Sequence, residues 1–104
     1  MRIGDRERIH TADALPAAAM LDLLGDLDAW RRGERFEDIL LVCRADARLP
    51  DEAHSYPPAG ALRAARQAAA AVRIDDLVAA GEDGKAIARE LRQRRIRAIQ
   101  EIPA

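Results

Sequence analysis

Four basic residues in the C-terminal part of the sequence are spaced to hold a phosphate backbone. Lys85, Arg89 and Arg92 follow one another at steps of four and three, which places them along one side of a helix, and Arg95 adjoins them. Each cation that meets a phosphate adds affinity by releasing counterions, without reading the base sequence. The spacing alone leaves a second interpretation equally open, namely a solvated helix face.

The turn before this helix is a candidate phosphate-binding turn. Its sequence, GEDGK, puts Gly81, Gly84 and Lys85 where the free N–H groups and the dipole of a helix N-terminus attract an anion. Glu82 and Asp83 lie in the same turn and would repel a phosphate. The alternative, which the spacing favours, is that Gly81 ends one helix and Asp83 caps the next.

The sequence offers no set of side chains that is typical of a catalytic or metal centre. His10 and His54 are far apart, and neither has a second histidine or a cysteine at ligand spacing. Ser55 only adjoins His54, which does not make a Ser-His-Asp triad. The single cysteine, Cys43, falls in an apolar stripe and is expected to be a small buried side chain. We therefore assign no catalytic residue, metal ligand or cofactor to this chain.

Composition indicates a single all-α domain. The chain has 104 residues, too few for a nucleotide-binding catalytic domain beside a helical one, and β-branched and aromatic residues are scarce. The formal net charge is only -1, but six basic residues outnumber one acidic residue between 84 and 100. No apolar run reaches membrane-spanning length, and the N-terminus lacks the apolar core of a secretory signal. A soluble cytoplasmic protein without membrane contact is the expectation.

Apolar periodicity predicts a small bundle of four to five helices that positions the basic stretch. The stripe Phe36, Leu40 and Cys43 marks a central helix, which is expected to pack as a hairpin against a leucine-rich helix before it. Residues 1–11 show a weak pattern and are expected to be a polar N-terminal segment or tail, whereas the proline-containing stretch 49–58 is expected to be an ordered loop. The predicted helices, within one domain over 12–104, are 16–31, 35–48, 58–72, 75–80 and 84–100.

Three segments of the chain carry a resemblance to a known family. They read AMLDLLGDLDAWRRGERFEDILLVCRADAR, SYPPAGALRAARQAAAAV and LVAAGEDGKAIARELRQRRIRAIQEI. The most telling pieces are Arg35-Phe36-Glu37, Cys43 to Arg48, Tyr56-Pro57 and Gly84 to Ile87. Over about residues 12 to 102 the chain is similar to the C-terminal helical region of bacterial tRNA nucleotidyltransferases, the CCA-adding enzymes, and more narrowly to the multifunctional CCA proteins.

The resemblance implies RNA binding without catalysis. In that family an N-terminal domain transfers nucleotides with Mg²⁺, CTP and ATP, and none of that domain is found in this sequence. The histidine-aspartate metal cluster of the family's hydrolase domain also lies upstream, so His10 is not expected to bind a metal. The helical region is implied to hold the elbow of tRNA through backbone contacts. The residues implied to contact RNA are Lys85, Arg89, Arg92 and Arg95, with Gly81 and Gly84 in the phosphate-binding turn.

Two other functions stay open from the sequence. The first is a helical module that docks a missing catalytic domain or a second copy of itself, with the basic stripe merely solvated. The second is an enzyme role, which requires that the natural polypeptide continue upstream of Met1. The preferred interpretation is a piece that corresponds to the tRNA-binding end of a CCA-adding enzyme.

The charged end of the central helix has an expected structural role. Asp46 and Arg48 are predicted to tie this helix to the loop at Tyr56-Pro57 through an ion pair or backbone hydrogen bonds. Removing the Asp46 carboxylate should then lower the melting temperature.

Overall fold

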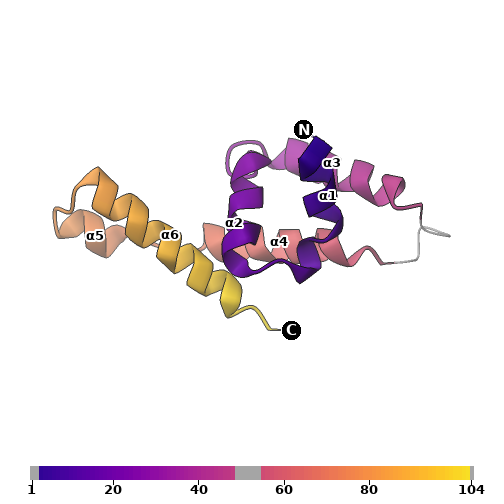
Figure 1. The fold of residues 1–104 in the computed structure, drawn as a ribbon. Coiled ribbons are helices and arrows are strands. Elements are labelled where there is room, and N and C mark those ends of the chain that lie inside the picture. Colours follow the sequence, from indigo (N-terminus) through magenta and orange to yellow (C-terminus); the bar gives the residue numbers. More distant parts are fainter. Residues whose placement is uncertain (1–2, 49–54, 104) are drawn as a thin grey trace.

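Helices make up most of the part of the chain that the computed structural model describes, residues 3–48 and 55–103. This described part holds no strand, so the all-α prediction is confirmed. Figure 1 shows the arrangement of the helices. In chain order, the elements are α1 (Ile3–His10), the 3-10 helix η1 (Ala12–Ala14), α2 (Ala17–Asp26), α3 (Gly33–Asp46), α4 (Pro57–Ala70), α5 (Asp75–Ala79) and α6 (Gly84–Gln100).

Local signals set several of the helix ends. Pro57 and Pro58 occupy the first turn of α4, where their fixed φ fits the helix and no N–H is needed. Gly81 follows α5 with a φ of 75°, the left-handed conformation that glycine adopts without strain. The side chain of Asp83 accepts a 2.8 Å hydrogen bond from the N–H of Ala86 at the start of α6. The predicted roles of Gly81 and Asp83 as helix-ending and capping residues are thus confirmed.

The end of α2 differs from the prediction. The helix stops at Asp26 and not at Arg31, because Asp28 adopts a left-handed conformation with a φ of 56°. The N–H of Ala29 then turns back to donate a 3.1 Å hydrogen bond to the carbonyl of Leu24. This geometry is a Schellman motif, with aspartate in the position that glycine usually holds.

Residues 3–11 are not the polar tail that the weak pattern suggested. Residues 3–10 form α1, and the side chain of Ile9 is fully buried in the core. Asp5 is also buried, at 5% exposure, and forms an ion pair with Arg8. Periodicity gave little signal because α1 is short and, among its side chains with a described burial, Ile9 is the only aliphatic one that is fully buried.

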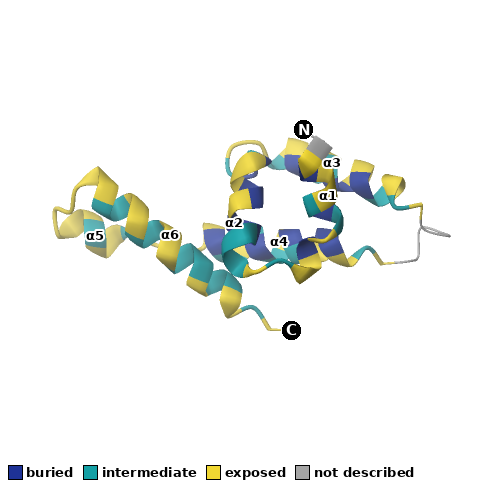
Figure 2. Cartoon of the chain, viewed as in Figure 1, coloured by how far each residue is buried: buried dark blue, intermediate teal, exposed yellow. Residues whose placement is uncertain are grey.

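A single hydrophobic core joins the first four α-helices (Figure 2). Figure 1 shows that α2 runs across the space between α3 and α4, so that α2 and α3 meet at a corner. The predicted side-by-side hairpin of these two helices is therefore wrong, although their apolar faces do share the core. The fully buried large side chains are Ile9, Leu23, Leu24, Phe36, Leu40, Cys43 and Leu62.

Arg66 of α4 fastens the connection between α2 and α3. Its Nε donates a 2.8 Å hydrogen bond to the carbonyl of Ala29, and its guanidinium lies 5.7 Å from the ring centre of Phe36. A Cβ atom on Gly33 would come within 3.0 Å of Nη2 of Arg66. Glycine at the first position of α3 therefore permits this close approach.

The C-terminal elements extend from this body as an arm, defined here as α5 and the N-terminal half of α6 (Figures 1 and 2). No residue of α5 or α6 is fully buried, whereas the other end of α6 packs against the body through α2 and α4. Ile99 and Ile102 contact the core from that end. None of the described helices is both long and apolar enough to cross a membrane. The predicted loop at 49–54, with His54, lies outside the described residues.

Candidate nucleic-acid interface

The predicted stripe of cations is present on α6, and its first two members are free. Lys85 and Arg89 are exposed and make no hydrogen bond or ion pair with any residue that the structure describes. Both lie on the arm, at one side of a helix whose own N-terminus is capped by Asp83. Their positive charges are therefore not neutralised by a bonded neighbour in the described chain.

Arg92 is partly engaged with the body. Its Nη1 lies 2.7 Å from Oδ1 of Asp22 on α2, and both side chains are about half exposed. An exposed pair of this kind adds little to stability, because water screens the attraction and two long side chains must be held in one geometry. A phosphate that approached α6 could therefore exchange with the Asp22 carboxylate.

Arg95 faces inward and differs from the other three. Its guanidinium carbon lies 4.5 Å from the ring centre of Trp30, which is a cation–π arrangement. Burial lowers the pKa of Arg95, since the charged form loses hydration. The four predicted RNA-binding residues therefore do not form one even surface: the structure places Lys85 and Arg89 outward, Arg92 at an edge and Arg95 against Trp30 in the turn after α2.

Several hydrogen-bonding groups of the turn from Gly81 to Lys85 are already bonded to residues of the flanking helices. The N–H of Gly81 donates to the carbonyl of Val78 at 3.1 Å, which closes α5. The Asp83 carboxylate occupies the start of α6, where it accepts from Ala86. A carboxylate oxygen thus holds the position at the helix N-terminus that a phosphate oxygen would take. Phosphate binding by Gly81 and Gly84 stays a prediction, and these contacts favour its alternative.

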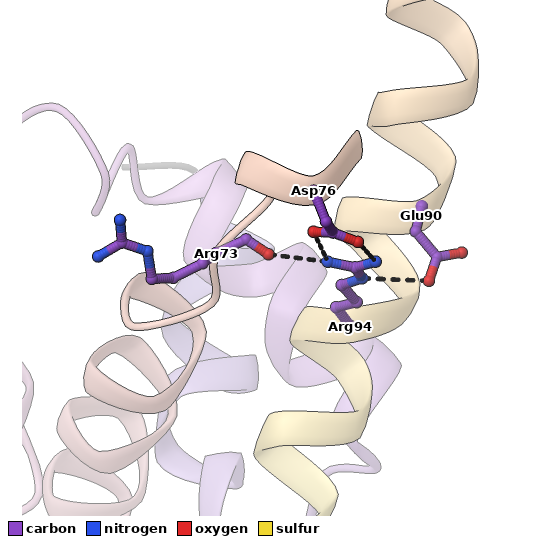
Figure 3. Close-up of polar contacts among 4 residues, drawn as sticks. All are labelled: Arg73, Asp76, Glu90 and Arg94. Carbon is purple, nitrogen blue, oxygen red and sulfur yellow. Dashed lines mark hydrogen bonds and ion pairs between the residues drawn. The ribbon is translucent and has the colours of Figure 1, made fainter. Parts of the chain in front are cut away.

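Arg94 joins α5 to α6 (Figure 3). The helical repeat places Arg94 on the side of α6 opposite Lys85. Its guanidinium donates to both carboxylate oxygens of Asp76 at 2.8 and 2.7 Å and to the carbonyl of Arg73 at 3.0 Å. Its Nε donates to Glu90 at 3.2 Å. These hydrogen bonds lower the pKa of Asp76 to about 2 and raise the pKa of Arg94. We call these four residues the Arg94 clasp.

The Arg94 clasp could not be found from the sequence. Arg94 and Asp76 lie 18 positions apart on different helices, so no helical repeat links them. The only local signal is Glu90, four residues before Arg94, which is the usual spacing of an ion pair on one helix. By sequence, Arg94 counts only among the basic residues of α6.

A cleft lies between α2 and α6 beside the Trp30–Arg95 contact. Its volume is about 750 Å³. The apolar part of its lining includes Leu21, Trp30 and Leu91, and its charged part includes Arg92 and Arg95. Nothing in the sequence pattern pointed to this cleft, because its lining comes from segments far apart in the chain.

The charged end of α3 is tied to the start of α4, but through a third residue. Nε2 of His10 lies 3.0 Å from Oδ2 of Asp46, and Nδ1 of His10 lies 2.6 Å from the hydroxyl of Tyr56. The hydrogen bond with His10 lowers the pKa of Asp46. The prediction that Asp46 helps to hold the Tyr56 segment is thus right in outcome, whereas the direct contact that it assumed is replaced by His10. Arg48 acts on Asp46 only through its charge.

Residues that could do chemistry are not gathered elsewhere in the described chain. No group of three or more histidine, cysteine, aspartate or glutamate side chains in that part could hold a metal ion. Cys43 is fully buried, as predicted, and burial raises the pKa of its thiol. The adjacent pair His54 and Ser55 lies partly outside the described residues.

Comparison with known proteins finds relatives that share most of this chain. The Multifunctional CCA protein of Nitrosococcus oceani is 50% identical over 95 residues, which are 89% of this chain and 23% of the relative. The protein of the same name from Vibrio cholerae is 43% identical over 99 residues, or 93% of this chain and 25% of the relative. The CCA-adding enzyme of Pseudomonas putida is 45% identical over 86 residues, or 83% of this chain and 23% of the relative.

The chain therefore spans about a quarter of the length of these relatives. No family model matches the chain. No solved structure matches it either.

Proposed function

Because this chain is homologous over about nine-tenths of its length to a region of the CCA-adding enzymes, we propose that it is a tRNA-binding helical region without catalytic groups of its own. Nucleotidyl transfer, with its Mg²⁺, CTP and ATP, then belongs to the remaining part of such a protein. The proposed setting is the cytoplasm, where tRNA would be the partner.

One observation carries this proposal: α6 presents cations that no described neighbour neutralises. Lys85 and Arg89 stand exposed on the arm, and Arg92 adjoins them in a weak exposed pair. Cations on a protruding helix can follow a phosphate backbone without a steric barrier from the body (Figure 1). The Arg94 clasp joins α6 to α5 (Figure 3). The helical repeat places Arg94 on the side of α6 opposite Lys85, so the clasp does not cover the surface around Lys85.

Binding of tRNA at several salt concentrations tests the proposal. Replacing Lys85 and Arg89 together with alanine is expected to weaken binding and to reduce the slope of log K against log salt by about 1 for each phosphate that is no longer bound. The matched control is the double variant Arg31→Ala/Arg35→Ala, which removes the same charge from exposed positions outside α6. The control should keep nearly the full slope.

Two results would contradict RNA contact by the stripe. One is an unchanged affinity and salt slope in the Lys85→Ala/Arg89→Ala variant. The other is an equal loss of affinity in both double variants, which would mean that only the net charge matters. Circular dichroism of each variant checks that the helices are retained.

A second candidate function rests on a different surface. Leu41 and Val42 on α3 are 58% and 53% exposed, which is high for large apolar side chains, and Val78 on α5 is 60% exposed. Such side chains fit the alternative of a docking or dimerisation module. Gel filtration at two protein concentrations tests self-association: an elution volume that shifts with concentration, and that Leu41→Ser/Val42→Ser returns to the monomer position, would support this alternative.

A further inference from the structure

The cleft between α2 and α6 contains an arginine whose hydrogen-bonding groups are not used. Arg95 packs its guanidinium on Trp30, but none of its N–H groups finds an acceptor within the described chain, and its Nε is buried. A guanidinium carries five N–H donors in a rigid fork that fits a phosphate or carboxylate. The guanidinium of Arg95 is therefore held against an aromatic ring, and Arg95 lines a cleft of about 750 Å³.

The acidic side chains of the cleft do not compensate Arg95. Asp22 pairs with Arg92 at 2.7 Å, and Asp26 pairs with Arg8 at 2.8 Å. Arg8 also pairs with Asp5, so both of the other arginines that line the cleft have acidic partners. Arg95 is the arginine of this lining that has no ion-pair partner in the described chain.

The walls beside Arg95 indicate which anion fits. Leu21, Trp30 and Leu91 give the cleft an apolar side, and its volume lies within the range of small-molecule sites, roughly 300–1,000 Å³. An inorganic ion would leave this apolar side in water. A ligand with both an anionic group and a flat ring would use both parts of the cleft.

We infer that the α2–α6 cleft binds one unpaired nucleotide of RNA, whose phosphate accepts hydrogen bonds from Arg95 and whose base packs against Trp30 and Leu91. Aromatic and arginine side chains are the usual partners of unstacked bases. The inference rests on the proposed function for the source of the nucleotide. The cations Lys85 and Arg89 on the same helix would guide the phosphate backbone toward the cleft.

Tryptophan fluorescence reads this site directly, because Trp30 is the only tryptophan in the sequence. The full chain is titrated with a 5′-phosphorylated single-stranded RNA tetranucleotide, with duplex RNA of equal phosphate content and with inorganic phosphate. We expect saturable quenching by the tetranucleotide, and no quenching by the other two at the same phosphate concentration. Equal quenching by inorganic phosphate, or none by the tetranucleotide, would overturn the inference.

Variants of Arg95 separate the cleft from the outer stripe. Arg95→Met keeps an apolar contact with Trp30 but loses the fork, and should weaken tetranucleotide binding at least about tenfold. Arg97→Met removes an exposed cation from the other side of the same helix and should change affinity less than about twofold. If Arg95→Met does not fold, as judged by its melting curve, Arg95→Lys is used in its place. Arg95→Lys should also lose affinity, because an ammonium group lacks the planar fork that donates two parallel hydrogen bonds to one phosphate.

The outcomes distinguish failure of this inference from failure of the proposed function. Lys85→Ala/Arg89→Ala should weaken tRNA binding yet leave quenching of Trp30 by the tetranucleotide in place, and that result would support both proposals. Quenching that persists unchanged in the Arg95 variants would overturn the cleft as the site, whatever tRNA binding shows.

Discussion

At the scale of single residues, His10 joins three parts of the chain. With a proton on Nε2, a neutral imidazole donates to Asp46 and accepts at Nδ1 from Tyr56. Burial raises the pKa of Tyr56 to about 12, so its hydroxyl keeps its proton and can donate. The bridge therefore links α1, the end of α3 and the residue that precedes α4.

Removing the Tyr56 hydroxyl should break this bridge at one end. Tyr56→Phe is expected to lower the free energy of unfolding by about 1 kcal/mol, because the half-buried Nδ1 of His10 loses its partner. Urea denaturation measures the change. The same substitution made in a His10→Ala background should have little effect, and equal losses in the two backgrounds would mean that the hydroxyl does not act through His10.

At the scale of elements, helix ends divide into those with a strong local signal and those without one. Gly81 and Asp83 carried such signals, and both act as predicted. Asp28 takes the same left-handed conformation as Gly81 without being glycine, which is why the end of α2 was misplaced. A sequence pattern indicates the left-handed conformation only where the residue that usually adopts it, glycine, is present. At Asp28 this conformation is imposed by tertiary contacts, such as the hydrogen bond from Arg66 to the carbonyl of Ala29.

Glycine at position 28 should therefore stabilise the protein. Asp28→Gly relieves the left-handed strain and is expected to raise the free energy of unfolding by about 0.5–1 kcal/mol, since only a weak exposed pair with Arg32 is lost. Chemical denaturation checks this. Ala45→Gly, at an exposed position in the last turn of α3, serves as the control and should lower stability by up to about the same amount. A loss of stability in Asp28→Gly would show that the aspartate side chain is needed.

The Arg94 clasp makes the attachment of α5 sensitive to acid. Because the folded-state pKa of Asp76 is about 2, below its ordinary value of 3.8, its stabilising effect is complete above pH 5 and is lost as the pH falls toward 2. The difference in melting temperature between the parent and Asp76→Asn should therefore be largest near neutral pH and shrink in acid. Glu82→Gln, an exposed acid outside the clasp, is the control. A difference that is the same at pH 6 and pH 3 would count against the clasp.

At the scale of the whole molecule, the chain is elongated. Its radius of gyration is 15.1 Å, whereas a compact domain of this length would have about 13 Å. The longest dimension is 53 Å against 28 and 20 Å for the other two. The excess length comes from the arm, where the described residues contribute no fully buried side chain.

Hydrogen exchange should follow this division. Amides of α5 and of the first half of α6 are expected to exchange faster than those of α3 and α4, because opening the arm exposes little apolar surface. Exchange measured by mass spectrometry resolves these segments. Equal protection across all four helices would mean that the arm unfolds only with the body.

Helix content and the cations of α6 were within reach of the sequence because both depend on local spacing. Lys85 and Arg89 stand free as the spacing suggested, but Arg95 turns inward since it packs on Trp30, which lies in the distant turn between α2 and α3. Likewise, the burial of Ile9 follows from three-dimensional contacts that no short window contains. What depends on pairs of residues far apart in the chain had to come from the structure.

Cys43 allows the opening of the core to be timed. It is the only cysteine in the sequence, its side chain is fully buried, and burial keeps it in the unreactive thiol form. A thiol reagent in excess can therefore modify the protein only after α3 separates from the core. When modification of Cys43 is faster than closing of the core, the labelling rate equals the rate at which the core opens. Labelling of Cys43 therefore measures that opening rate directly.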